Sequence, residues 1–247
     1  MERGFYMLGS GLITQSRKLT AISNNIANAE TNGYKKQKVS TTTFGEMVIS
    51  RLDSQSSTPI GSLSLATIAD KTNVIHSEGT LKSTDRALDF AIVGEGFFAV
   101  RGNNGVRYTR NGSFNVDEEG YLILNNEGRV LGADGNPIRV GTDQIQADEA
   151  GNLMVNGTTV GTLGVYNFAD YNNLKLADNG MYTATGGAVL LQNPNISWKK
   201  LEGSNVDPAE EMTNALAAQR ELQSCSQAVK MYDQVMSRAS TEIAKIN

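Results

Sequence analysis

The sequence predicts an α+β chain in which long N- and C-terminal helices pack together and a central antiparallel β-rich domain is inserted between them. Glycine, which favours turns and weakens helices, is concentrated in the middle: 17 of the 25 glycines lie between Thr80 and Ser197. Near both ends, apolar residues recur at alternating spacings of three and four, as on one side of a helix. Turn-forming dipeptides divide the middle into short apolar runs, which is typical of antiparallel strands.

The N-terminal helix is predicted to run from about Gly4 to Asn28. Its apolar positions form a narrow seam, which is the pattern of a coiled coil rather than the broader stripe of a globular helix. The seam consists of Phe5, Leu8, Leu12, Gln15, Leu19, Ile22 and Ile26, of which only Gln15 is polar.

The C-terminal helix is predicted to begin after Asp207, which can cap it, with Pro208 in its first turn and Glu210 at capping-box spacing. Its seam carries no charged residue. The seam consists of Ala215, Ala218, Leu222, Cys225, Val229, Tyr232, Met236, Ala239, Ile243 and Ile246. A helix of roughly 38 residues would be about 60 Å long, and it would bury its seam only against another helix.

The middle of the chain contains runs such as "FFAV", "YLIL" and "TLGVYNF". The turn signals between runs include Asn103-Asn104-Gly105, Asp134-Gly135-Asn136 and Asn156-Gly157. The Ser/Thr-rich stretch 40–72 is expected to be a long connecting loop or an irregular strand pair. The predicted domains are 1–39 with 201–247 (terminal helices), 40–75 (connecting segment) and 76–200 (β domain).

Composition limits the partners. The net charge of -4 argues against nucleic acid, which needs a basic face, so Lys35, Lys36 and Lys38 are expected on the solvated surface. The single cysteine, Cys225, allows neither an internal disulfide nor a cysteine-based zinc site, and it is expected to be a small buried apolar group. No apolar run is long enough for a membrane span or a secretory signal, so direct membrane insertion is not expected.

Catalysis is not predicted. His76 is the only histidine, and its surroundings do not suggest a nucleophile–histidine pair. Gly94-Glu95-Gly96 lacks the third glycine of a dinucleotide loop, and the acidic turn around Asp117 does not have the spacing of a calcium loop. We therefore expect no enzyme activity, no cofactor and no metal site.

A junction rich in asparagine, "AISNNIANAETNGYKKQK", follows the first helix at residues 21–38. Asn24, Asn25 and Asn28 can bond backbone groups where the helix frays, and Asn32-Gly33 suits a tight turn with positive φ. The segment is predicted to be a helix exit that turns sharply in a crowded place.

Three segments together resemble one family. "LTAISNNIANAETNGYKKQ", "ALDFAIVGEGFFAV" followed by "RYTRNGSFNVDEEGYLIL", and "LEGSNVDPAEEMTNALAAQRELQSCSQAVKMYDQVM" are similar to the conserved blocks of bacterial flagellar basal-body rod proteins of the FlgF/FlgG type, relatives of the flagellar hook protein. The resemblance implies a structural subunit that is exported unfolded by the flagellar type III apparatus without a cleaved signal peptide. It also implies helical self-assembly into the hollow drive shaft of the basal body, next to other rod and hook proteins, with the helices forming an inner tube.

On this resemblance the junction and both seams become candidate assembly sites. The candidate assembly residues are Asn24, Asn25, Asn28, Gly33, Leu12, Leu19, Ile22, Ile26, Leu222, Val229, Tyr232, Met236 and Ile243. Lys35 and Lys36 would lie near a subunit boundary, and Gly33→Val would stop assembly while leaving the β domain folded. The terminal helices would be frayed in the monomer and ordered by neighbouring subunits.

Two other classes of protein fit parts of the sequence. A cell-wall or ligand-binding β module on a coiled-coil stalk would form a closed oligomer of fixed number. A β-rich hydrolase would be a monomer with an acidic cleft. The long seams, without a group of catalytic residues, favour open-ended assembly over both.

Overall fold

The structure, a computed structural model, describes residues 2–53, 56–103, 105–177 and 180–244, of which 2–3, 44–53, 56–67 and 242–244 are described without side chains. The chain forms two compact units. The terminal unit contains Met1–Ala27, Lys36–Ile75 and Val206–Asn247, and the central unit contains Asn28–Lys35 and His76–Asn205. Helices at both ends and strands between them confirm the predicted α+β class.

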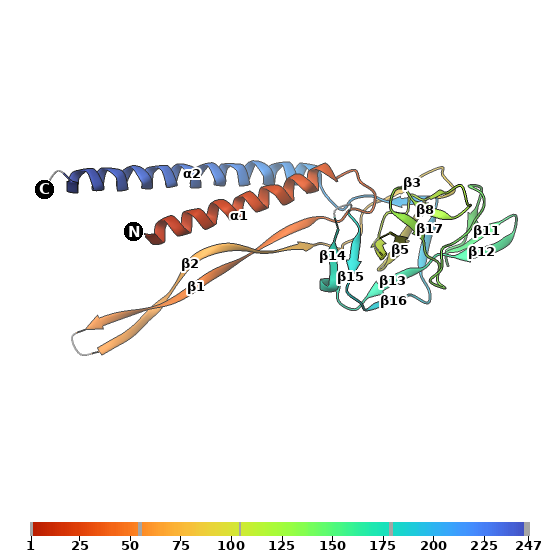
Figure 1. Cartoon of the computed structure of the whole chain (residues 1–247), viewed down its shortest axis with the longest axis horizontal. Helices are drawn as coiled ribbons and strands as arrows, with labels where there is room; N and C mark the ends of the chain where they lie inside the picture. Colours follow the sequence, from red (N-terminus) through yellow and green to blue (C-terminus); the bar gives the residue numbers. More distant parts are fainter. Residues whose placement is uncertain (1, 54–55, 104, 178–179, 245–247) are drawn as a thin grey trace. The chain divides into compact units, whose positions relative to one another are not determined.

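The terminal unit contains two long helices, α1 (Glu2–Ala27) and α2 (Pro208–Ala244), which lie side by side and antiparallel (Figure 1). Two glycines of α1, Gly4 and Gly11, face side chains of α2. A Cβ atom added to Gly4 would lie 3.5 Å from the Tyr232 ring, and one added to Gly11 would lie 3.6 Å from Cys225 Sγ. The contacts therefore advance by one heptad along each helix, in opposite directions.

The start of α2 has the predicted cap. The Asp207 carboxylate accepts hydrogen bonds from the backbone N–H groups of Ala209 at 2.9 Å and Glu210 at 3.4 Å. Its predicted seam matches the side of α2 that is at least half covered, as far as Tyr232. From residue 233 to residue 241 every side chain is exposed, because α1 begins opposite Tyr232.

A long β-hairpin completes the terminal unit. Its strands β1 (Gln37–Asp53) and β2 (Ser56–Val74) pair antiparallel from Gln37↔Val74 to Asp53↔Ser56, with register shifts after Val39 and Ile49. The Arg17 guanidinium on α1 donates a hydrogen bond to the Ala69 carbonyl oxygen at 3.2 Å. Of the two alternatives for residues 40–72, the irregular strand pair is confirmed; residues 54 and 55 lie outside the described part.

The central unit is built of short strands. Its elements are β3 (Leu81–Ser83), β4 (Phe90–Val93), β5 (Phe97–Gly102), β6 (Gly105–Thr109), β7 (Asn115–Val116), β8 (Leu122–Leu124), β9 (Gly128–Val130), β10 (Gln146–Ala147), β11 (Asn152–Val155), β12 (Thr158–Thr162), β13 (Val165–Phe168), the 3-10 turn η1 (Tyr171–Asn173), β14 (Leu174–Leu176), β15 (Tyr182–Ala184), β16 (Ala188–Leu190), β17 (Asn195–Trp198) and β18 (Lys200–Glu202).

The strands of the central unit pair antiparallel. The largest sheet has the order β14-β15-β6-β5-β9-β8-β7, and β13 joins β5 to β16. Smaller sheets are β10-β11-β12, β17-β4 and β18-β3. Side chains from these strands and their connections form one apolar core, which includes Phe90, Phe98, Phe114, Leu122 and Leu163.

Two predicted turns are confirmed. Asn156 and Gly157 have φ angles of 50° and 79° and connect β11 to β12. Gly135, with φ of 76°, lies in a turn whose Asn136 N–H bonds the Asp134 carboxylate. Asn104, in the third predicted turn, lies outside the described residues.

The domain boundaries predicted from sequence stay a prediction. In the structure, the compact units place residues 28–35 with the central strands and the hairpin with the helices.

Candidate functional site

Asn25 connects three parts of the terminal unit. It is 1% exposed, and its side-chain amide pairs with the backbone of Gln37 as a strand would: it donates to the Gln37 carbonyl at 2.8 Å and accepts from the Gln37 N–H at 2.8 Å. The same amide nitrogen donates to the Glu211 carboxylate at 2.9 Å. Asn25 therefore ties the end of α1 to the start of β1 and to the first turns of α2.

Lys36 completes this polar cluster. Its ammonium lies 2.8 Å from Glu211 and 3.2 Å from Glu210. Burial opposes a charge on Lys36, but the hydrogen bonds to Glu211 and Glu210 outweigh it and raise the pKa of Lys36. Burial likewise opposes a charge on Glu211, but hydrogen bonds from Lys36 and Asn25 outweigh it and lower the pKa of Glu211. Both groups are therefore charged across the neutral pH range.

Gly33 is a position that only glycine fits. Its φ is +71°, and an added Cβ atom would lie 2.3 Å from the Asn111 backbone nitrogen and 2.4 Å from the Arg110 carbonyl carbon. The Gly33 N–H donates to the Glu202 backbone carbonyl at 2.8 Å. The predicted tight turn is present, and it packs directly on the backbone of the central unit.

A buried ion cluster lies next to this turn. The Lys35 ammonium is 2.5 Å from Glu202 Oε1, and the Arg110 guanidinium is 3.2 Å from Glu202 Oε2. Lys35, Arg110 and Glu202 are 1%, 3% and 1% exposed. Burial lowers the pKa of Lys35, although the Glu202 carboxylate partly offsets this effect.

The predicted solvated surface for the lysines is therefore wrong for two of the three. Lys35 is buried against Glu202 and Lys36 is mostly covered beside Glu211, whereas Lys38 is exposed. A group of lysines in a sequence does not show whether carboxylates from distant parts of the chain will pair with them in the fold. For the same reason Glu202, Glu211 and Arg110 were not predicted, since each is an ordinary charged residue in its local sequence.

The remaining candidate assembly residues are distributed over both units. Asn24 is exposed, and Asn28 is half-buried and accepts a hydrogen bond from the Thr31 hydroxyl at 3.2 Å. The seam residues Leu12, Leu19, Ile22, Ile26, Leu222, Val229 and Tyr232 are half-buried, and Met236 is exposed. The side chain of Ile243 lies outside the described part.

His76 has no catalytic surroundings. It lies among Phe97, Tyr171 and Tyr182, with ring centroids 4.8 to 5.8 Å away. Burial, together with the charges of Lys35 and Arg110, lowers its pKa to about 4. His76 is thus a neutral packing residue at neutral pH.

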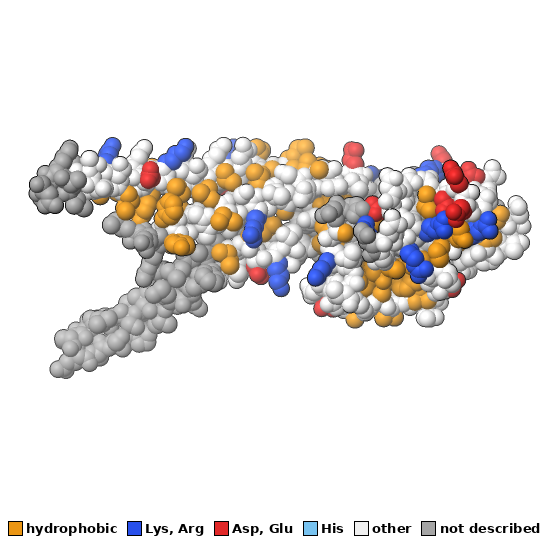
Figure 2. Space-filling model, in the orientation of Figure 1, with side chains coloured by type: hydrophobic (Ala, Val, Ile, Leu, Met, Phe, Trp, Pro, Cys, Tyr) orange, Lys and Arg blue, Asp and Glu red, His pale blue; other side chains and the backbone are white. Residues whose placement is uncertain are grey.

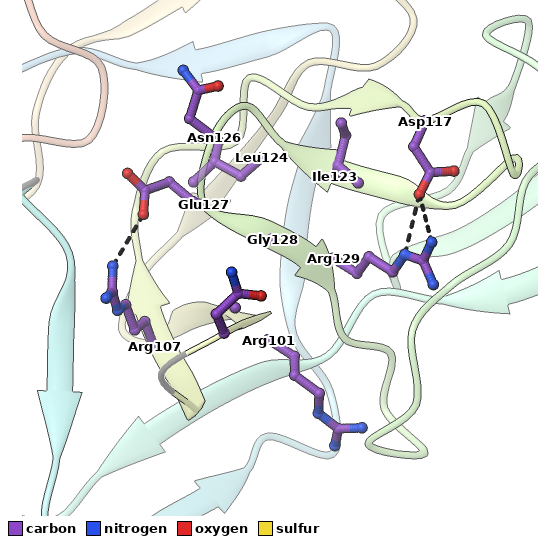
Figure 3. A pocket seen from close by; sticks show the side chains of 11 residues that line it. Arg101, Arg107, Asp117, Ile123, Leu124, Asn126, Glu127, Gly128 and Arg129 are labelled. Carbon is purple, nitrogen blue, oxygen red and sulfur yellow. Dashed lines mark hydrogen bonds and ion pairs between the residues drawn. The ribbon is translucent and has the colours of Figure 1, made fainter.

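A pocket of about 630 Å³ in the central unit is lined by three arginines (Figure 3). Two of them are neutralised: Arg107 lies 3.1 Å from Glu127, and Arg129 lies 3.1 Å from Asp117. Arg101 donates to the Gly135 carbonyl at 3.0 Å. The pocket therefore presents alternating charges rather than a basic site for an anion.

The described residues contain no group of three or more histidine, cysteine, aspartate or glutamate side chains that could hold a metal ion. In the same part of the chain, no helix has the length and apolarity needed to cross a bilayer.

Comparison with known families matches three parts of the chain. Residues 5–35 match the model "Flagella basal body rod protein", residues 91–167 match "Flagellar hook protein FlgE/F/G D1 domain", and residues 199–242 match "Flagellar basal body rod FlgEFG protein C-terminal". These segments contain most of the junction, many of the strands around the core and most of both helices. They define the class of the chain: a flagellar rod or hook protein.

Relatives that match over most of their length narrow the class from a rod or hook protein to a rod protein. The chain is 31% identical to the "Flagellar hook-basal body complex protein FlhO" of Bacillus subtilis (strain 168) over 100% of both chains. It is 32% identical to the "Flagellar basal-body rod protein FlgG" of the same organism over 96% of this chain and 97% of the relative. It is also 32% identical to the "Flagellar basal-body rod protein FlgF" of Mesorhizobium japonicum over 89% of each.

The chain belongs to the flagellar basal-body rod protein family and is a structural rod subunit. Because this family is structural, the prediction that the chain is not an enzyme is confirmed. The resemblance found in the sequence is confirmed as well.

Proposed function

We propose that this rod subunit is exported unfolded and self-assembles helically into the hollow drive shaft of the flagellar basal body, which transmits torque to the hook. The observation that carries the proposal is the amount of apolar surface left uncovered on α1 and α2. Tyr6, Leu216 and Val235 are 77%, 59% and 64% exposed. Figure 2 shows hydrophobic side chains gathered on the helix pair.

Apolar residues are exposed on more than one side of the helices. The seam of α2 faces α1 as far as Tyr232, but Met212, Leu216, Met231 and Val235 are exposed outside the seam. Phe5, Tyr6, Met7 and Ile13 are exposed on α1. One partner helix cannot cover several sides at once, so a rod built from many copies supplies the missing neighbours.

The pairing of α1 with α2 is proposed to be an antiparallel coiled coil. The heptad steps from Gly4 to Gly11 and from Tyr232 to Cys225 support this geometry. The uncovered stretch of α2 after Tyr232 is proposed to fray in the isolated chain and to become ordered against a neighbouring copy.

The candidate assembly residues keep their proposed role, but they fall into two groups: residues that act within the chain and residues that contact neighbouring subunits. Asn25 and Gly33 act within the chain, because their contacts hold the junction in place. Asn24 and Met236 are exposed and are proposed to contact neighbouring subunits directly. The neighbours are proposed to be copies of this chain together with other rod and hook proteins, reached through the flagellar type III export apparatus without a cleaved signal peptide.

Val235→Glu tests the proposal. Because Val235 is 64% exposed, the isolated variant should keep its helical content, measured by far-UV circular dichroism. In a strain lacking the native chain, the variant should fail to enter isolated basal bodies and should abolish motility, since a charge would be buried between copies. Gln234→Glu adds the same charge at an adjacent exposed position and serves as the control. Basal bodies that contain the Val235→Glu chain at the native level would overturn the proposed contact.

A further inference from the structure

The ion cluster of the central unit joins segments that are far apart in the chain. Lys35 belongs to the junction segment 28–35, and Glu202 lies 167 residues later, at the end of β18. Arg110 follows β6, between the two. The three side chains thus bring the first and last segments of the central unit onto the strand core.

Glu202 is the centre of this cluster. Its carboxylate accepts hydrogen bonds from Lys35, Arg110 and the Gly79 N–H, the last at 3.0 Å, and its backbone carbonyl accepts from Gly33. Lys35 also donates to the Ser77 carbonyl at 2.7 Å, and Arg110 donates to the Gly94 carbonyl at 2.7 Å. One carboxylate therefore connects the junction, the segment after the hairpin and the strand core.

The charges of the cluster do not balance. Lys35 and Arg110 share one carboxylate, so with both of them protonated the cluster carries one excess positive charge. Glu78 is exposed and its carboxylate bonds the Gly94 N–H, which leaves it a minor partner of Lys35. Removing Glu202 would leave two buried cations without a counter-charge, whereas removing Lys35 would leave one neutral pair.

We propose that Glu202 fastens residues 28–35 to the strand core within the central unit through this cluster of unequal charges. We expect the fastening to be local, because none of the three charged residues belongs to the apolar core around Phe90 and Phe98. We call residues 28–35 the strap, because one buried carboxylate holds them against the strand core. This proposal goes beyond the rod function, and its test uses the isolated chain.

The test is amide hydrogen exchange of the full chain, with Glu202→Gln, Lys35→Met and the double variant. The amides of Gly33 and Tyr34 report on the strap, since they bond the Glu202 and Thr31 carbonyls. Amides of β5 report on the core. In Glu202→Gln we expect exchange at Gly33 and Tyr34 to be at least about tenfold faster, with β5 unchanged.

The variants with Lys35→Met separate the charge argument from simple loss of a contact. Lys35→Met changes the strap itself but leaves one cation paired with one carboxylate. Amide exchange at Gly33 and Tyr34 should therefore accelerate less than in Glu202→Gln. In the double variant the exchange should be slower than in Glu202→Gln alone, because one unpaired cation has been removed. Glu119→Gln, which breaks an exposed pair with Arg129, is the control and should change nothing in the strap.

Three results would overturn the proposal: unchanged exchange at Gly33 and Tyr34 in Glu202→Gln, equal acceleration in β5, or greater acceleration in Lys35→Met than in Glu202→Gln. If Glu202→Gln cannot be recovered folded, recovery of the double variant supports the charge argument. Failure of the double variant while Lys35→Met folds normally contradicts it.

Discussion

At the scale of single residues, Gly33 has two independent reasons to be glycine. Its backbone lies in the left-handed region, and the Asn111 backbone leaves no room for a Cβ atom. The second reason changes the expected phenotype of a substitution. A side chain at Gly33 would push residues 28–35 away from the Arg110–Asn111 backbone, so it would disturb the central unit itself and not assembly alone.

Gly33→Ala is therefore expected to destabilise the isolated chain by about 2–4 kcal/mol, from the positive φ and the overlap with backbone atoms together. Urea unfolding followed by the fluorescence of Trp198, the single tryptophan, measures this in the central unit. Gly157→Ala is the matched control, because Gly157 has φ of +79° with nothing within 4 Å of the added atom. It should cost only about 1 kcal/mol. Equal losses in the two variants would show that the close packing at Gly33 is unimportant.

His76 gives the central unit a dependence on pH. Its pKa is about 4 in the folded state against an ordinary 6.5, so below pH 6.5 the unfolded chain takes up a proton that the folded chain does not. The free energy of unfolding should therefore fall between pH 6.5 and about pH 4, by about 1–2 kcal/mol once partial exposure is taken into account. His76→Phe keeps an aromatic ring among Phe97, Tyr171 and Tyr182 and should remove this part of the decline. A variant whose stability falls as steeply as that of the native chain would exclude His76 as the cause.

The local sequence predicts the backbone conformation of the junction, but it does not predict which distant residues the junction contacts. The Asn32-Gly33 dipeptide was enough to predict a positive φ, because that preference is local. The approach of Asn111 was not predictable, because it depends on how residues 78 positions apart meet in the fold. The burial of Lys35 has the same origin.

At the scale of secondary structure, Asn25 acts as a substitute strand for the first residue of β1. A hairpin of two strands is marginal alone, so its attachment to α1 and α2 matters for its stability. The Asn25 side-chain amide bonds both the N–H and the carbonyl of the Gln37 backbone, and it also donates to the Glu211 carboxylate.

Asn25→Ala is expected to cost the terminal unit about 2–4 kcal/mol, because it leaves buried polar groups of Gln37 and Glu211 without this partner. Thermal or urea unfolding monitored by far-UV circular dichroism follows the helices of this unit. Asn24→Ala, at the exposed neighbouring position, should change stability by less than about 0.5 kcal/mol. Comparable losses from both would mean that the junction depends on helix propensity rather than on the pairing with Gln37.

The helices were the best-predicted elements. Their positions and the cap at Asp207 follow from local patterns, although the seam residues Phe5 and Met236 are exposed. The capping-box role of Glu210 stays a prediction, and the structure places the Glu210 carboxylate 3.2 Å from the Lys36 ammonium. The hairpin was only half predicted, because serine and threonine fit a loop and a strand alike.

At the scale of the whole molecule, the chain enters its central unit twice, at residues 28–35 and 76–205, between three segments of the terminal unit. Residues 28–35 are a short central segment within terminal sequence, and composition gives no sign of it. This nesting is why the compact units could not be drawn from the sequence, whereas the α+β class could.

Limited trypsin digestion of the dilute chain should show the difference in stability along the molecule. Arg238 lies in the fully exposed stretch of α2 and should be cut early, whereas Lys35 and Arg110 are buried and should be cut late. Intact-mass spectrometry of early time points identifies the order. Early cleavage after Lys35 would show that the strap opens readily in solution, and resistance at Arg238 would argue against a frayed end of α2.

The tight turn between β11 and β12 also offers a practical route to seeing this subunit in the cell. Asn156 and Gly157 are exposed, and the strands on either side are held by their own pairing and by the core contact of Leu153. A short peptide epitope inserted between these two residues should leave both units folded. Antibody labelling of such a chain would mark its position along an intact flagellum without touching the helices on which assembly is proposed to depend.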